Sequence, residues 1–135
     1  MAKITVQTTV NAPIEKVWTM WSEPEHITKW NQASPDWHSP HAENDLRTGG
    51  SFTTTMAAKD GSMQFEFGGT YTAVEKYKRI DYALADGRKV TVAFTPNHDG
   101  VFIEETFDPE KENPEEMQQS GWQAILDSFK TYVEQ

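Results

Sequence analysis

One acidic residue, Glu105, falls on the apolar side of a sequence that alternates like a β-strand. Val101, Ile103 and Phe107 alternate with other residues, and Glu105 shares their register. A carboxylate buried without a partner has a raised pKa, and such groups cluster at functional sites. We therefore expect Glu105 to be an acid inside a pocket and a candidate acid–base catalyst.

Two structural alternatives remain for Glu105. A bulge could turn its side chain outward, because a slip of one residue exchanges the two faces of a strand. Glu105 could also form a structural ion pair with Arg47 or Arg88. The variant Glu105→Gln would distinguish a pocket acid, because ligand binding or its pH dependence should then change.

Five tryptophans form the second candidate group. Trp18, Trp21, Trp30 and Trp37 precede the main series of strands, and Trp122 lies near the C-terminus. Aromatic walls with a few polar groups are typical of small-molecule sites. We assign Trp18 and Trp21 to the core, whereas Trp30, Trp37 and Trp122 fit either a core or a site. Trp37 lies in a polar segment without periodic partners, so it could form a lid over a cavity.

Histidine and carboxylate side chains gather around His38 and His41, with Asp36 and Glu43 nearby. A His-x-x-His pair in a loop can bind a metal ion. Its spacing is not that of a zinc motif and the pattern supplies no third ligand, so we expect no metal and no cofactor. His38 remains a second candidate for an acid–base role.

Asp45 and Arg47 share one face of a short extended stretch. We expect an ion pair that orders the chain, although the same pair could hold a carboxylate ligand. Gly49-Gly50 and Gly68-Gly69 lack the spacing and the following helix of a phosphate or dinucleotide site.

The elements that must position these residues are mostly strands. Alternating apolar residues predict one strand over 3–10 and a meander of about six strands that ends near Phe107. Residues 31–44 are rich in Ser, Pro, His and Asn and show no period, so we expect an ordered loop there. Long ordered loops in compact domains are often functional.

Helical patterns frame these strands. Two short helices follow the first strand: the first carries an apolar face from Ile14 to Trp21, and the second begins with capping-box spacing at Ser22. The last helix is predicted over 113–134, with Asn113 as N-cap and Pro114 at the first helical position. Its roughly 30 Å length at ~1.5 Å per residue matches the width of a small domain.

The order of elements predicts an α+β fold: a curved antiparallel sheet wrapped around the long C-terminal helix. Strands joined by hairpins pair antiparallel, and the apolar face of the sheet must be covered. The chain of 135 residues is long enough for one domain, which we expect to span 1–135. The edge strands of such a sheet leave room for a homodimer.

Composition narrows the classes of partner. The chain has 12 Lys and Arg against 21 Asp and Glu, a net charge of −9, and no cysteine. We expect neither nucleic acid nor membrane as a partner, because both carry negative charge. Residues 1–10 contain no apolar signal segment, so we expect a cytoplasmic protein.

Several short motifs resemble one family. They are Ala12-Pro13 with Val17-Trp18, Pro24-Glu25-His26 with Trp30, Asp45-Leu46-Arg47 with Gly49-Gly50, Gly69, and Gly121-Trp122. In this order they resemble the bacterial relatives of the Hsp90 ATPase activator's C-terminal domain, members of the START-like (SRPBCC, Bet v 1-like) helix-grip superfamily. The resemblance implies a cavity between the long helix and the sheet. It also implies hydrophobic or amphipathic small-molecule ligands and, in a few members, cyclisation or hydrolysis.

Three functions are consistent with these patterns. The first is a non-enzymatic domain that binds a hydrophobic or aromatic small molecule under the last helix. The second is a cyclase- or hydrolase-type enzyme that uses Glu105 or His38, and the third is an interaction module for a chaperone or stress-response partner. The predicted ligand-binding residues are Trp30, Trp37, Phe52, Met56, Phe65, Phe67, Tyr82, Phe94, Glu105, Trp122 and Phe129.

Overall fold

A computed structural model describes residues 3–135, and within them the chain forms seven strands and three helices. In chain order these are β1 (Ile4–Val10), α1 (Ile14–Ser22), α2 (Pro24–Trp30), β2 (Trp37–Asn44), β3 (Ser51–Ala58), β4 (Gln64–Glu75), β5 (Arg79–Leu84), β6 (Lys89–Asn97), β7 (Gly100–Phe107) and α3 (Glu115–Glu134).

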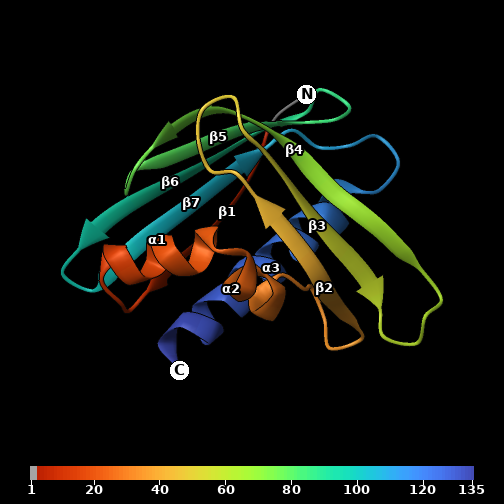
Figure 1. The fold of residues 1–135 in the computed structure, drawn as a ribbon, viewed down its shortest axis with the longest axis horizontal. Coiled ribbons are helices and arrows are strands. Elements are labelled where there is room, and N and C mark those ends of the chain that lie inside the picture. Colours follow the sequence, from red (N-terminus) through yellow and green to blue (C-terminus); the bar gives the residue numbers. More distant parts are fainter. Residues whose placement is uncertain (1–2) are drawn as a thin grey trace.

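The seven strands form one sheet in the order β1-β7-β6-β5-β4-β3-β2, and every neighbouring pair is antiparallel. Six consecutive strands therefore form a meander, and β1 joins it beside the last of them. The sheet curls around α3, which crosses its concave side, while α1 and α2 lie near the open end (Figure 1). α3 packs on β1 and α2 packs on β2. This is the α+β helix-grip fold that the sequence predicts.

The core lies between α3 and the concave side of the sheet. In β1, Ile4, Val6 and Val10 are buried as the alternation predicts. From α3, Leu126, Phe129 and Val133 are buried, which matches its predicted apolar stripe. Burial of this apolar surface is the main force that holds the helix against the sheet.

The lack of a period in residues 31–44 suggested a single loop, but this prediction is wrong. Residues 37–44 form the edge strand β2. Its pairing with β3 shifts register between His38 and His41. The shift breaks the period of two, and most outward side chains of an edge strand are polar. Backbone pairing, which leaves no sequence pattern, therefore defines this strand.

The helix starts also differ from the predicted caps. Ser22 is the last residue of α1, and its hydroxyl has no hydrogen-bond partner within residues 3–135, so the predicted capping box does not form. α3 begins at Glu115 without a side-chain cap. Instead, the Gln118 amide donates to the carbonyl of Asn113 at 2.8 Å and accepts from the amide of Glu110 at 2.8 Å.

The side chains of α3 also bind the outer edge of β1. Gln123 donates to the carbonyl of Gln7 at 3.0 Å, and Lys130 donates to the carbonyl of Thr9 at 2.7 Å. None of the helices within residues 3–135 is both long and apolar enough to cross a membrane.

Candidate functional site

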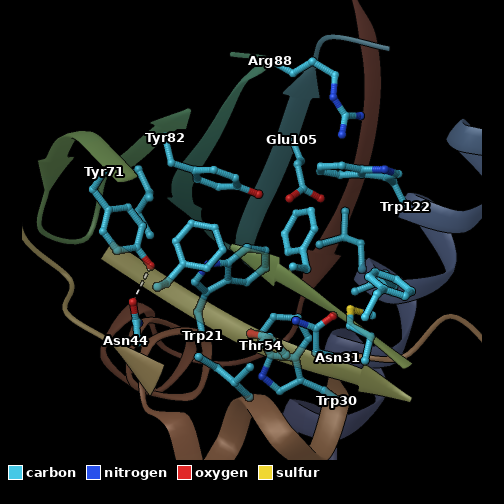
Figure 2. Close-up of a pocket in the computed structure, with 18 of the residues that line it drawn as sticks. Trp21, Trp30, Asn31, Asn44, Thr54, Tyr71, Tyr82, Arg88, Glu105 and Trp122 are labelled. Carbon is cyan, nitrogen blue, oxygen red and sulfur yellow. Dashed lines mark hydrogen bonds between the residues drawn. The ribbon is translucent and has the colours of Figure 1, made fainter. Parts of the chain in front are cut away.

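A cavity of about 320 Å³ lies between α3 and the concave face of the sheet (Figure 2). Its lining comes from α1, α2 and the residue after it, the strands β2 to β5 and β7, the turn before β6, the segment after β7, and α3. The lining residues are Trp21, Ile27, Trp30, Asn31, Asn44, Phe52, Thr54, Met56, Phe65, Phe67, Tyr71, Ile80, Tyr82, Arg88, Glu105, Glu110, Trp122, Ile125 and Leu126.

Eight of the nineteen lining residues are aromatic. Phe52 packs against Tyr82 with ring centroids 4.9 Å apart and against Tyr71 at 5.2 Å. On the opposite side, Trp21 lies 5.1 Å from Trp30. These contacts hold large rings in fixed orientations, so the wall offers preformed apolar faces.

Glu105 is the buried acid of this wall. It lies in β7 between Val6 of β1 and Val92 of β6, which pair with it in register. Only 7% of the residue is exposed, and within residues 3–135 its carboxyl has no hydrogen bond or ion pair. Burial alone raises the pKa of the Glu105 carboxyl to about 8. The structure thus agrees with the predicted inward orientation and rules out the outward bulge.

The groups near Glu105 come from β5, the turn between β5 and β6, and α3. The hydroxyl of Tyr82 points toward the carboxyl, and Arg88 and Trp122 lie beside it (Figure 2). Arg88 donates to Asp86 at 2.7 Å, so the predicted pair of Glu105 with Arg88 does not form, and Arg47 pairs with Asp45 on the surface instead. A carboxyl with a pKa near neutral can donate or accept a proton or a hydrogen bond.

A second polar group includes Tyr71 of β4, which pairs with Tyr82 of β5. The hydroxyl of Tyr71 donates to Oδ1 of Asn44 at 2.5 Å, and Nδ2 of Asn44 donates to the carbonyl of Ser22 at 2.6 Å. Burial raises the pKa of Tyr71, which keeps the phenol protonated. The pair joins α1, β2 and β4, and it places a fixed polar group in the cavity wall.

Eight of the eleven predicted ligand-binding residues line the cavity. They are Trp30, Phe52, Met56, Phe65, Phe67, Tyr82, Glu105 and Trp122. The lining reaches the surface at Phe65, which is 47% exposed. Trp122 is held in place by stacking on Phe107, with ring centroids 3.9 Å apart.

The other three residues lie outside the lining. Trp37 lies in the edge strand β2 and packs on the ring of Phe65, with ring centroids 5.8 Å apart. Phe94 and Phe129 are buried in the core and contact Trp21 at 5.5 Å and 5.0 Å. They support the wall from behind.

The remaining candidate residues lie away from the cavity. His38 is exposed on β2. Asp45 and Arg47 form an exposed ion pair at 2.9 Å, as predicted. Within residues 3–135, the group with a spacing suited to a metal ion is Glu23, Glu25 and His26, which includes neither His38 nor His41.

Sequence reasoning missed several lining residues. Trp21 was assigned to the core although it also faces the cavity. Tyr71 continues the alternation of Phe65 and Phe67 along β4, and that signal could have identified it. Arg88 follows a turn and Asn44 ends an edge strand, so neither has a periodic signal.

The comparisons with known proteins agree with this fold. The profile of the family described as Activator of Hsp90 ATPase homolog 1-like protein matches residues 11–134. No match is found among the curated proteins.

Solved structures with the same fold are numerous. The AHSA1-like protein from Aeromonas hydrophila is 46% identical, with a TM-score of 0.93 over 98% of this chain and 92% of that one. Chr148 from Cytophaga hutchinsonii is 63% identical, with a TM-score of 0.85 over the same shares. The Aha1 dimer from Colwellia psychrerythraea is 15% identical, with a TM-score of 0.77 over 99% of this chain and 97% of that one. The chain therefore belongs to the family of Activator of Hsp90 ATPase homolog 1-like proteins.

Proposed function

We propose that this chain binds a small organic molecule with an apolar, aromatic body in the cavity beneath α3. The observation that carries this proposal is the cavity of about 320 Å³ with its wall of aromatic side chains. Ligand sites typically measure about 300–1,000 Å³ and combine apolar walls with a few placed polar groups. The volume lies at the low end, so the ligand is a compact molecule.

The polar groups of the wall support an oriented ligand. Glu105 and the Tyr82 hydroxyl form one polar group, and the bonded pair of Asn44 and Tyr71 forms a second, with the ring of Tyr71 6.2 Å from that of Tyr82 (Figure 2). An apolar body between them would bury its surface against rings while its polar atoms reach one of these two groups. Such an arrangement gives affinity through burial and orientation through hydrogen bonds.

The tryptophans allow a direct test with the unmodified protein. Indole N–H signals in a ¹H–¹⁵N spectrum should shift for Trp21, Trp30 and Trp122 when an aromatic fragment library is added. Trp37 lies outside the lining and serves as the internal control. Shifts confined to Trp37, or none across the library, would contradict the proposal.

A pair of variants tests the same point by occlusion. Thr54 lines the cavity from β3, so Thr54→Phe should fill it and abolish the indole shifts. Thr70 is exposed on β4 and outside this lining, so Thr70→Phe should bind as the wild type does. Dispersed amide spectra of both variants would establish that each is folded.

For assembly, we propose that a dimer of this chain would not extend the sheet at β1. The relative from Colwellia psychrerythraea is described as a dimer. Gln123 and Lys130 donate hydrogen bonds to backbone carbonyls on the outer edge of β1. These bonds support the proposal, because a strand of a second copy would need the same carbonyls to pair with β1.

A further inference from the structure

The cavity wall carries an uneven set of charges. Glu105 and Glu110 line it together with one cationic side chain, Arg88. The guanidinium of Arg88 already donates to Asp86 outside the lining at 2.7 Å. The cavity therefore holds two carboxyl groups and one cation, and that cation is already bonded to a third carboxyl group, that of Asp86.

Glu105 in particular has no ion-pair partner on the elements packed against it within residues 3–135, because the nearby Arg88 pairs with Asp86 instead. β1 and β6 present Val6 and Val92 in register with it, and α3 presents Trp122. β5 presents the Tyr82 hydroxyl. Among residues 3–135 no Lys, Arg or His lies within 4.0 Å of this carboxyl, although 93% of the residue is buried. A carboxyl in such a place is usually paired.

We propose that the ligand is an organic cation, a compact aromatic body carrying an ammonium group that binds between the Glu105 carboxylate and the neighbouring rings. The inference rests on the proposed function and specifies the ligand class of the same cavity. The rings of Tyr82 and Trp122 lie beside the carboxyl (Figure 2). An ammonium group is attracted both by a carboxylate and by the faces of aromatic rings, and both attractions are stronger where water is excluded.

Proton linkage gives this binding a distinctive pH dependence. In the empty cavity burial raises the pKa of the Glu105 carboxyl to about 8, so the group is mostly protonated at neutral pH. A cation favours the ionised form, so binding below that pH releases a proton. Affinity for a permanently charged cation should therefore rise as the pH increases toward about 8.

The test uses two probes of the same shape, 4-(trimethylammoniomethyl)phenol and 4-neopentylphenol. The first probe has a quaternary nitrogen, which is charged at every pH, and the second has a neutral quaternary carbon in the same place. Dissociation constants are measured by titration of the folded wild type at about pH 6.5 and about pH 8.5. At the higher pH, we expect the cation to bind about tenfold tighter or more than the neutral phenol. At the lower pH, where Glu105 is mostly protonated, this preference for the cation should be smaller.

Two substitutions locate the effect. Glu105→Gln should reduce affinity for the cation about tenfold or more while affinity for the neutral phenol stays within about twofold. Glu104→Gln removes an exposed carboxylate from the other face of β7 and should change neither value. Glutamine matches the shape of a protonated glutamic acid, so the Glu105 variant should stay folded.

The outcomes separate the two proposals. Equal or tighter binding of the neutral phenol by the wild type overturns the cation inference and leaves the cavity as a ligand site. The same holds if Glu105→Gln binds the cation as the wild type does. Failure of both probes to bind, together with silent indole signals in the fragment library, overturns the proposed function as well.

Discussion

The carboxyl group of Glu105 occupies a position that strands of a core normally fill with an apolar side chain. It lies in the same inward row as Val101, Ile103 and Phe107, which are fully buried. Ionising a group among such neighbours is unfavourable, because the surroundings cannot replace its hydration. Glu105 should therefore lower stability, a cost that proteins accept at functional sites.

The cost should appear in the pH dependence of unfolding. An unfolded glutamate ionises near 4.5, whereas the folded Glu105 holds its proton up to about 8. Between these values the unfolded chain binds fewer protons, so the free energy of unfolding falls as pH rises. Each unit of pKa difference corresponds to about 1.4 kcal/mol, so the total is on the order of a few kcal/mol.

Glu105→Gln should remove that loss of stability. We expect its free energy of unfolding, from urea titration, to exceed that of the wild type at about pH 8 and to approach it below about pH 4.5. Glu104→Gln is the control, because its carboxylate is exposed. A wild type and Glu105→Gln with parallel pH profiles would show that Glu105 is ionised with an ordinary pKa.

The hydroxyl of Tyr71 supplies a second prediction for a single side chain. Tyr71→Phe removes the donor to Asn44 Oδ1 and leaves that buried oxygen without its partner. The expected cost is about 1–3 kcal/mol in urea unfolding. Tyr82→Phe is the matched control, because the Tyr82 hydroxyl has no hydrogen bond within residues 3–135. It should lower the free energy of unfolding by less than Tyr71→Phe does. Equal effects of both variants would contradict a structural role for the Asn44 bond.

Strand β1 depends on α3 for its outer hydrogen bonds. Gln123 accepts from the amide of Gln7 at 3.4 Å and donates to the carbonyl of the same residue at 3.0 Å. An edge strand otherwise leaves such groups to water or to another chain. The helix therefore both covers the core and satisfies the free edge of the sheet.

Gln123→Leu should loosen this edge. We expect a loss of about 1 kcal/mol in the free energy of unfolding and faster hydrogen exchange at the amide of Gln7. Gln119→Leu changes an exposed residue of the same helix and should leave that exchange rate unchanged. Unaltered protection of Gln7 in Gln123→Leu would mean that the side-chain bonds contribute nothing to the edge.

The elements differ in how far the sequence could predict them. β1 and β7 have clean alternation, and α3 has a regular apolar stripe, so their patterns identify both type and buried face. β2 has neither, because a register shift and a polar outer face remove the period. Its existence depends on pairing with β3, and pairing between segments distant in sequence leaves no local pattern.

For the whole molecule, the architecture was predictable from the sequence, whereas the lining of the cavity was predictable only in part. The order of elements requires a long helix against an antiparallel sheet, and eight predicted residues do meet beneath it. Which rings face open space depends on sheet curvature and on the angle of α3, which no local pattern encodes. Phe94 and Phe129 were therefore predicted at the cavity although they lie behind Trp21.

Net charge governs how copies of the whole molecule meet. Each copy carries −9, and the two edges of the sheet are protected, β1 by side chains of α3 and β2 by its register shift. Salt screens repulsion between like-charged copies, since the Debye length falls from about 30 Å at 0.01 M to about 8 Å at 0.15 M. We therefore expect any self-association to strengthen with salt.

Sedimentation equilibrium measures this directly. The apparent molar mass should rise, or the dimer dissociation constant should fall, between about 0.01 M and about 0.3 M sodium chloride. The titration is repeated with Glu112→Lys and Glu115→Lys combined, which replaces two exposed acids near the start of α3. This double variant has a smaller net negative charge, so its self-association should depend less on salt. A dimer that dissociates as salt increases would instead require ion pairs between the copies, because only attraction between opposite charges is weakened by screening.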